Sequence, residues 1–181
     1  TWMGAFFHSV SARTAGFSTY PLGTFSTSGL LILIVLMFIG ASPGSTGGGI
    51  KTSTFFVLIQ SIKAMATNKS EKAFHYSLPV NAFRKAAVIT LLALGVVVTG
   101  TYLMSVMEPH LSLVDMLFEV TSAFGTVGLS TGITPDLCDG SKLLSILIMY
   151  IGRLGPLTIA SIWHFSRGER TSYPEGNVAI G

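Results

Sequence analysis

Charged residues are scarce in this sequence, because aspartate, glutamate, lysine and arginine together make up 10% of its 181 residues. A soluble domain needs more charge on its surface, whereas 49% hydrophobic residues is the balance of a chain whose surroundings are largely lipid. The single cysteine, Cys138, excludes an intrachain disulfide. The four histidines are scattered, and no nucleophile stands beside a base. The sequence therefore predicts neither an enzyme nor a metalloprotein, and it offers no nucleic-acid motif.

The clearest membrane span runs from Ala86 to Met107 and contains no charged residue. As a helix it would extend about 33 Å, enough for a bilayer core of about 30 Å. Its position and length exclude a signal peptide, and a buried helix of a large soluble protein is the alternative. Two further apolar segments begin near Phe25 and Lys142, and the second continues to about Phe165.

Charges separate onto two sides of these segments. The stretch between Lys63 and Lys85 is basic, as is the tail with Arg167 and Arg170, so the positive-inside rule predicts that both are cytoplasmic. We therefore expect a multi-pass protein in contact with membrane lipid in the cell membrane, with an acidic outer face that concentrates cations. The acidic residues beyond the other end of the clean span are Glu108, Asp115, Asp136 and Asp139.

One glycine-centred heptapeptide occurs twice. RTAGFST at residues 13–19, here called the first motif, returns 112 residues later as GTVGLST at residues 125–131, the second motif. The same offset takes LMFIG at 36–40 onto IMYIG at 148–152. A duplicated structural unit accounts for both matches.

The second motif lies in a segment, residues 112–140, whose two ends must both be on the acidic side. Its first part, Ser112 to Phe124, reads as a helix too short to cross the membrane, with Ser112 as N-cap and Asp115 in the first turn. A short helix followed by a glycine-centred return is a re-entrant loop, which is tolerated at membrane depth only where it is buried in protein or lines a cavity. The negative pole of this helix would favour a dehydrated cation.

The tripeptide Thr126-Val127-Gly128 matches the start of the TVGYG filter of potassium channels, in which backbone carbonyls replace the hydration shell of the ion. A helix-capping glycine repeated by descent is the alternative. Ala15 replaces Val127 in the first motif, which should matter little because the carbonyls face the ion. The predicted K+-binding residues are Thr14, Ala15, Gly16, Thr126, Val127 and Gly128.

A glycine-rich stretch, GASPGSTGGGIKTS at 40–53, suggests a phosphate loop, but Ile50 separates the last glycine from Lys51 and no strand precedes it. The surrounding segment, 25–65, must cross the membrane an odd number of times, yet one helix of that length would extend about 60 Å. We therefore predict an unwound interruption that lines the cavity under the filter.

The 112-residue offset places Arg153 at the level of this interruption, and a charge inside a span indicates function unless the side chain snorkels to the interface. We predict that Arg153 holds the interruption in place by donating to its carbonyls or to its hydroxyls. Lys51 is either a second such residue or a snorkelling one. The candidate gate comprises Gly44, Ser45, Thr46, Gly47, Gly48, Gly49 and Arg153.

Together with GRLGP at 152–156, these stretches resemble the third and fourth repeats of the Trk/Ktr/HKT superfamily of potassium transporters, and YPEGNVAIG at 173–181 resembles the end of the Ktr-type membrane subunit. The resemblance implies an all-α membrane fold of repeated helix–pore loop–helix units around a pseudo-fourfold pore, with Gly16 and Gly128 as filter glycines. It also implies transport of K+, with Na+ as the alternative ion, and no covalent cofactor. A homodimer and a cytoplasmic nucleotide-binding regulatory ring are the implied partners, and a bacterial inner membrane is the expected location.

The first of the two pore units is incomplete in this sequence. The first pore unit has no outer helix, so we expect two more repeats in polypeptide outside this sequence, unless two copies of the chain close the ring. Arg13 should face away from the ion path and brace the first motif against neighbouring carbonyl or acidic groups. The alternative function is a non-conducting membrane scaffold or accessory subunit.

These interpretations divide the chain into four parts. They are a third pore unit at 1–66 (pore loop 2–20, broken helix 25–65), a cytoplasmic linker at 67–85, a fourth pore unit at 86–166 (outer helix 86–107, pore loop 112–131, inner helix 142–166) and a cytoplasmic tail at 167–181.

Overall fold

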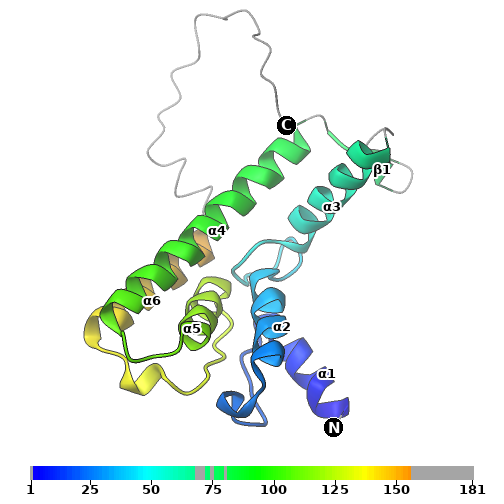
Figure 1. The fold of residues 1–181 in the computed structure, drawn as a ribbon. Coiled ribbons are helices and arrows are strands. Elements are labelled where there is room, and N and C mark those ends of the chain that lie inside the picture. Colours follow the sequence, from blue (N-terminus) through cyan, green and yellow to red (C-terminus); the bar gives the residue numbers. More distant parts are fainter. Residues whose placement is uncertain (1, 68–71, 74–75, 80, 156–181) are drawn as a thin grey trace, which may run out of the picture.

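The computed structural model describes residues 2–67, 72–73, 76–79 and 81–155, and almost all regular structure in these ranges is helical (Figure 1). The only strands described are two short ones that pair antiparallel inside the predicted linker, a small exception to the all-α prediction. The elements are α1 Trp2–Ser11, η1 Leu22–Thr24, α2 Thr27–Phe38, α3 Thr52–Thr67, β1 Lys72–Ala73, β2 Tyr76–Ser77, α4 Ala82–Met107, α5 Leu113–Gly125, η2 Thr134–Asp136 and α6 Asp139–Leu154.

Helix α4 is the one described helix long and apolar enough to cross a membrane, with a mean hydropathy of 2.1 over its most apolar window. It begins at Ala82 rather than at the predicted Ala86, because charged residues near a helix end can extend their side chains away from the apolar segment. Arg84 and Lys85 thus lie within its first turn, and Glu108 follows its other end. The predicted inner helix, 142–166, corresponds to α6, and its part beyond residue 155 lies outside the described residues.

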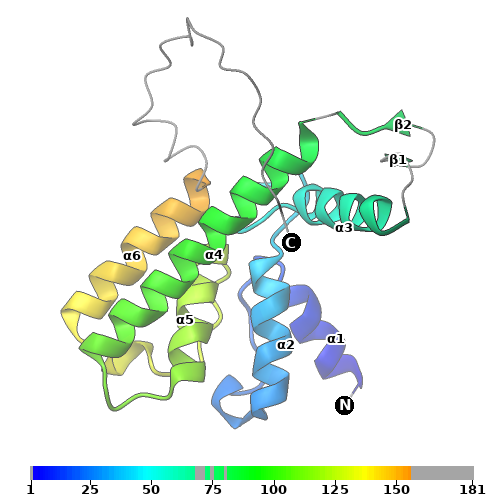
Figure 2. The same ribbon diagram turned by 45° about the horizontal axis from the view of Figure 1, so that its top comes forward.

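Three helices lie side by side in the second half of the chain (Figure 2). Helix α5 begins at the end of the molecule where α4 finishes, runs part of the way back, and is followed by an extended return to the start of α6. Helix α2 packs against the other side of α5, and α3 packs against α4. The short helix α5 is therefore enclosed by α2, α4 and α6, which explains why nine of its thirteen residues are buried.

The 112-residue offset reappears in the secondary structure. It takes η1 onto η2 without a shift, and it takes the first residue of α2, Thr27, onto the first residue of α6, Asp139. It also superposes the two N-caps, because Ser26 Oγ accepts from Gly29 N and Cys138 Sγ accepts from Ser141 N. This cap starts α6 at Asp139, three residues before the predicted position. The sequence repeat thus corresponds to a repeated order of elements.

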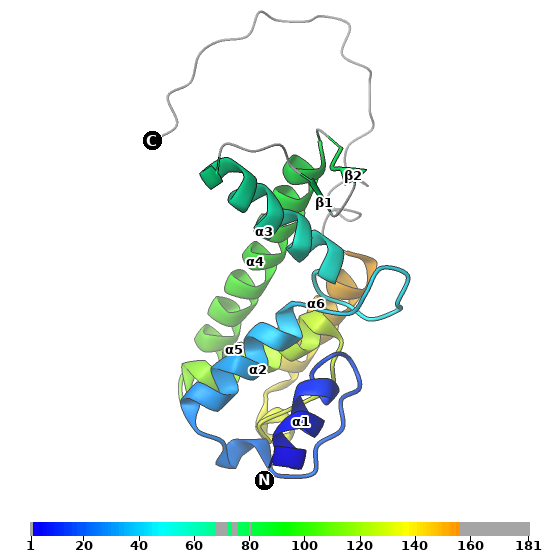
Figure 3. The same ribbon diagram turned by 90° about the vertical axis from the view of Figure 1, so that its right-hand side faces the viewer.

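The two halves differ where α2 ends. Helix α2 stops at Phe38, and α3 starts at Thr52, so that residues 39–51, here called the glycine-rich loop, have no helical structure. The loop returns on itself, since Ile39 and Ile50 form an isolated parallel bridge and Gly40 N donates to Ile50 O at 2.8 Å. Helix α3 then leaves in a different direction from α2 (Figure 3). The segment predicted as one broken helix is therefore two helices with a closed loop between them.

The core consists of two clusters that meet at α5. One joins α4, α5 and α6 and includes Val97, Val120 and Ile148. The other joins α2 to the second motif and to the end of the segment before the first motif, and it includes Ala12, Met37 and Phe118. Because opposite faces of α5 belong to different clusters, this helix fixes the second motif relative to both halves of the chain.

A polar tie holds α4 to α6 at their shared end. Glu108, which follows α4, is buried, and its carboxylate accepts a hydrogen bond of 2.6 Å from Cys138 N, just before α6. This backbone hydrogen bond lowers the pKa of Glu108. The carboxylate therefore remains ionised at neutral pH and keeps the turn into α6 in place.

Candidate functional site

The two motifs follow the same unusual backbone path. Thr14 and Thr126 have φ angles of 72° and 51°, and Gly16 and Gly128 have φ angles of 76° and 92°. Among the described residues these two threonines are the only ones other than glycine with positive φ, a conformation that is costly for a β-branched side chain. Because the same two positive φ angles recur in both motifs, the two loops have the same backbone conformation at these positions.

The motifs lie backbone against backbone. A Cβ atom on Gly16 would lie 2.2 Å from the carbonyl oxygen of Val127, and one on Gly128 would lie 3.8 Å from the Cα of Gly16. The Val127 carbonyl therefore faces the first motif across a gap that only glycine leaves open. Sequence repetition predicted two similar loops, but their contact comes from the tertiary structure.

Helix α5 ends in a double hydrogen bond that directs the chain into the second motif. Thr126 N donates to Ala123 O and Val127 N donates to Ser122 O, which is the Schellman arrangement with Thr126 as the left-handed residue. Gly128 lies two residues beyond this cap. The alternative that the motif glycine serves only to cap the helix is therefore disfavoured, because a threonine does so.

The first motif closes its helix differently. Ala15 N and Gly16 N both donate to Ser11 O, at 3.0 Å and 3.2 Å. Arg13, which stands where the second motif has Gly125, is exposed, and its Nη1 donates to Gly40 O at 3.4 Å. This contact matches the expectation that Arg13 braces the loop against a neighbouring carbonyl group.

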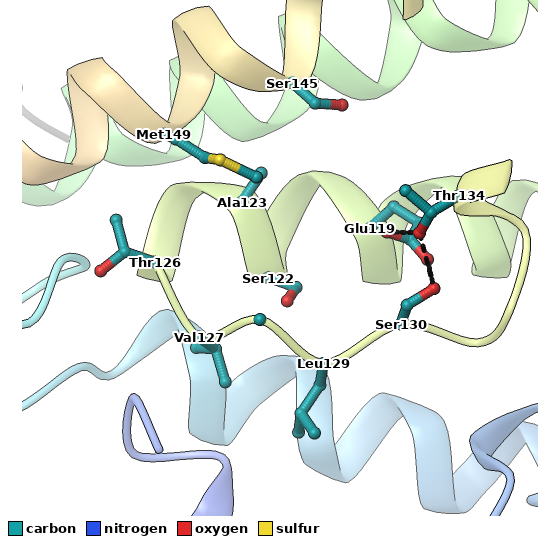
Figure 4. Close-up of a pocket in the computed structure, with 11 residues that line it drawn as sticks. Glu119, Ser122, Ala123, Thr126, Val127, Leu129, Ser130, Thr134, Ser145 and Met149 are labelled. Carbon is teal, nitrogen blue, oxygen red and sulfur yellow. Dashed lines mark hydrogen bonds between the residues drawn. The ribbon is translucent and has the colours of Figure 1, made fainter. Parts of the chain in front are cut away.

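A carboxylate of α5 that the sequence analysis did not single out holds the end of the second motif by hydrogen bonds. Glu119 of α5 is buried and accepts hydrogen bonds from Ser130 Oγ and from Thr134 Oγ1, the latter at 3.2 Å (Figure 4). Ser130 Oγ also accepts from Gly132 N at 2.9 Å. An acidic residue in the middle of α5, between Phe118 and Val120, was the available sequence signal. Its partners lie 11 and 15 residues away, so spacing alone could not identify them.

A cavity of about 320 Å³ lies between α5, the second motif and α6. Figure 4 shows Met149 and Ser145 on its α6 side and Ser122 on its α5 side. Thr126 stands at the end of α5 with its hydroxyl pointing past that end rather than along the helix. This hydroxyl is therefore directed to the region that the glycine-rich loop occupies.

The glycine-rich loop contacts both motifs at their threonines. A Cβ atom on Gly47 would lie 2.8 Å from Oγ1 of Thr14, and one on Gly48 would lie 3.0 Å from Oγ1 of Thr126. Gly48 N donates to Thr126 Oγ1 at 2.9 Å. The loop thus lies across the start of both motifs, and Gly47 and Gly48 are needed because no side chain fits at these two positions.

Lys51 contacts two carbonyls in the middle of the loop, where we had predicted contacts from Arg153. Lys51 Nζ donates to Ser45 O at 2.9 Å and to Gly47 O at 2.6 Å. Within the described part of the chain, the exposed Arg153 has no hydrogen bond to the loop. Lys51 is the last residue of the loop, so its side chain needs only to fold back, whereas the Arg153 side chain comes from α6 and lines a cavity beside the loop.

That cavity, of about 420 Å³, still brings most of the candidate gate together. Arg153 of α6, Lys51 of the loop and Ile89 of α4 all line it. Two members of the predicted gate, Gly44 and Gly48, do not line the cavity. The loop residues that do line it are Ser45, Thr46, Gly47 and Gly49.

Comparison with known proteins identifies this architecture. The family model TrkH, described as cation transport protein, matches residues 1–166. The chain belongs to the TrkH family. This family is one of transporters, which agrees with the prediction that the protein is not an enzyme, and the match confirms the resemblance to Trk and Ktr proteins.

Several TrkH-family relatives are similar over nearly the whole chain. The Ktr system potassium uptake protein B is 38% identical in Bacillus subtilis and 40% identical in Vibrio alginolyticus, over 98% and 99% of this chain and 40% of each relative. The potassium/sodium uptake protein NtpJ of Enterococcus hirae is 38% identical over 97% of this chain and 41% of its own length. The chain therefore spans about two fifths of the curated relatives it matches.

A solved structure supports the fold. The potassium transporter TrkH from Vibrio parahaemolyticus has a TM-score of 0.72 to this chain, at 22% identity, over 90% of this chain and 37% of its own. This likeness establishes the helical membrane-transporter fold.

Proposed function

We propose that this chain supplies two neighbouring units of a pseudo-fourfold potassium pathway, in which backbone carbonyls of the two motifs bind a dehydrated K+ ion. The observation that carries the proposal is the contact between the motifs, where the Val127 carbonyl faces Gly16 across a gap with no room for a side chain. Two carbonyl-bearing loops side by side are the repeating element of a carbonyl-lined filter.

Helix direction supports a cation as the ligand. Helices α1 and α5 both begin at the end of the molecule farther from the β1–β2 ribbon, and both finish at a motif (Figure 1). Their C-terminal ends carry the negative pole of the helix dipole. Because relatives are named for potassium uptake and one for potassium and sodium uptake, K+ is the proposed ion and Na+ the second candidate.

We propose the glycine-rich loop as the gate of this pathway. It lies against both motif threonines, and Lys51 holds it through two carbonyls while Arg153 faces it across the cavity. Two cations beside the path would also raise the barrier to another cation. The functional gate set is then Ser45 to Gly49 with Lys51 and Arg153.

The proposal extends to the setting of the chain. The charge distribution supports a multi-pass protein of the bacterial inner membrane, with the end of α4 that carries Arg84 and Lys85 in the cytoplasm and Glu108 outside. A homodimer and a cytoplasmic nucleotide-binding ring remain the proposed partners. Cysteines at Lys72 and Asp136, in a Cys138→Ser background, should react with an impermeant thiol reagent from opposite sides, and reaction of both from outside would reject this orientation.

Substitution of the motif glycines tests the filter against the scaffold alternative. Gly16→Ala should abolish most K+ uptake, because its Cβ meets a backbone carbonyl at 2.2 Å. Gly128→Ser should reduce the preference for K+ over Na+ by a strained backbone rather than by collision, since φ is 92° and only Gly16 Cα is near. Uptake of both ions is measured in a strain deficient in potassium transport, with the full-length protein and its membrane insertion quantified.

Two other glycines provide matched controls. Gly132→Ser introduces a side chain at a φ of 106° outside the tripeptide, and Gly95→Ala fills open space on α4. Both should insert and retain selectivity. A scaffold would tolerate Gly128→Ser as well as it tolerates Gly132→Ser, and equal selectivity in these two variants would reject the filter.

A further inference from the structure

We infer that the Gly47–Gly48 peptide group is a latch that competes with a cation for the hydroxyl of Thr126, so that a cation at the inner end of the second motif favours release of the glycine-rich loop. The inference rests on the proposed function of the motif. It adds a coupling between ion occupancy and the gate, through one named oxygen atom.

A single peptide group is held at both of its polar ends. Its carbonyl, Gly47 O, accepts from Lys51 Nζ at 2.6 Å, and its N–H, on Gly48, donates to Thr126 Oγ1 at 2.9 Å. Hydrogen bonds in such a chain polarise one another, so the ammonium group strengthens the donor at the other end of the peptide. Lys51 is therefore a positioning residue for the contact between the loop and the motif.

The latch fits tightly. Gly48 is buried, and a Cβ atom on it would lie 2.8 Å from Phe124 O as well as 3.0 Å from the Thr126 side chain. The peptide thus rests against the last turn of α5 with no room for a shift toward the helix. Release of the hydrogen bond requires the loop to move away from the motif.

A cation and the latch need the same oxygen. The Thr126 hydroxyl has one hydrogen to donate and its oxygen lone pairs to offer, and the hydrogen of Gly48 N–H occupies part of that capacity. A cation bound to the same oxygen would face the positive end of the N–H dipole at close range, where the two repel. Binding of the cation and closure of the latch therefore oppose each other.

The two halves of the chain differ in this respect, which provides a control. Thr14 occupies the equivalent place in the first motif and lies beside Gly47, but within the described residues its hydroxyl receives no hydrogen bond from the loop. The competition is thus confined to Thr126. By thermodynamic linkage, the factor by which bound K+ weakens the closed latch equals the factor by which the closed latch weakens the affinity for K+.

Hydrogen exchange of the loop amides tests this inference on the full-length protein in detergent. Exchange of the peptide covering residues 46–50 is followed by mass spectrometry while K+ replaces choline at constant ionic strength. We expect K+ to speed exchange by roughly two- to tenfold, the factor set by one hydrogen bond. Thr126→Ser should retain this response, because it retains the hydroxyl.

Matched variants isolate the oxygen. Thr126→Val should exchange fast with and without K+, whereas Thr14→Val, the same change in the other motif, should keep slow exchange and the K+ response. Lys51→Met should speed basal exchange, and Lys51→Arg should restore it. Slow, K+-responsive exchange in Thr126→Val would overturn the inference.

Binding of K+ is measured by calorimetry in the same samples. If K+ binds the parent protein but leaves exchange of residues 46–50 unchanged, the coupling is refuted and the proposed filter stands. If K+ does not bind at all, the proposed function fails together with the inference.

Discussion

The two repeats share a backbone path but not an environment. Helix α5 lies between α2, α4 and α6, and nine of its residues are buried. Its counterpart α1 has only two buried residues, His8 and Ser11, and exposes Trp2, Met3 and Phe6. Since the positive-φ threonine and glycine recur in both, the motif sequence specifies the loop, and the neighbours determine how firmly it is held.

The same contrast explains the largest sequence difference between the motifs. A Cβ atom on Gly125 would lie 2.8 Å from Met37 O, because α2 passes directly beside the end of α5. In the first motif the equivalent Arg13 is exposed, and its side chain reaches Gly40 O instead. Where one repeat uses close backbone packing, the other uses a long side chain.

The segments after the motifs differ in the same way. Gly40 and Gly152 are equivalent under the 112-residue offset, and each lies against a carbonyl oxygen. Gly152 of α6 meets the buried end of α5, whereas Gly40, near the start of the glycine-rich loop, meets Gly48 O of the same loop, much of which is exposed. The first contact is confined by the core, and the second can be relieved if the loop shifts and gives up its hydrogen bond to Thr126.

The largest effect should therefore come from Gly152→Ala. Its Cβ would lie 1.9 Å from Phe124 O, and we expect a loss of about 3 kcal/mol, the upper part of the usual range for overpacking. Gly40→Ala, with a separation of 2.1 Å from Gly48 O, should cost about 1 kcal/mol, because the loop can shift at the cost of the hydrogen bond between Gly48 and Thr126. Denaturant unfolding of the full-length protein in mixed micelles measures both.

Gly95→Ala is the control for these alanine substitutions, since nothing lies within 4 Å of its Cβ position. It should leave stability unchanged or slightly higher. Equal losses for Gly40→Ala and Gly152→Ala would show that the two repeats are equally confined and would refute the comparison.

An intermediate effect is expected at the serine of the motif. Ser130→Ala removes the hydroxyl that bonds buried Glu119, and should lower stability by about 1–2 kcal/mol. The offset places Phe7 where Glu119 stands, so the equivalent Ser18 lacks this partner and is exposed. Ser18→Ala should change stability by less than about 0.5 kcal/mol. If Ser18→Ala lowered stability as much as Ser130→Ala, the proposed difference in hydrogen bonding between the two repeats would be refuted.

The smallest effect is expected at the helix caps. Ser26→Ala removes an oxygen acceptor at 3.3 Å from Gly29 N and should cost about 1 kcal/mol. Cys138→Ala removes a sulfur, which is a weak acceptor, at 3.4 Å from Ser141 N and should cost about 0.3 kcal/mol. Ser112→Ala serves as control, because that side chain makes no capping hydrogen bond in the described structure. The reverse order for Ser26 and Cys138 would contradict this account of the caps.

Much of the fold could be predicted from local pattern. The uncharged run from Ala86 to Met107 lies within α4, and the glycines after α2 interrupt the helix. The short helix before the second motif starts at Leu113, directly after the predicted N-cap Ser112, although that side chain makes no capping hydrogen bond. Boundaries were less certain, because charged residues and a cysteine cap extend α4 and α6 beyond the apolar pattern. Side-chain contacts across the repeats had no local signal.

The sequence by itself determined the repeat, since one offset aligns the motifs, the short helices and the caps, and these features depend on neighbours along the chain. Only the tertiary structure decided which groups meet across it: the Val127 carbonyl with Gly16, the Gly48 amide with Thr126, and Lys51 rather than Arg153 with the loop carbonyls. The physical reason is range. Backbone conformation and capping follow from residues within a few positions, whereas the partner of a buried polar group depends on how distant helices pack.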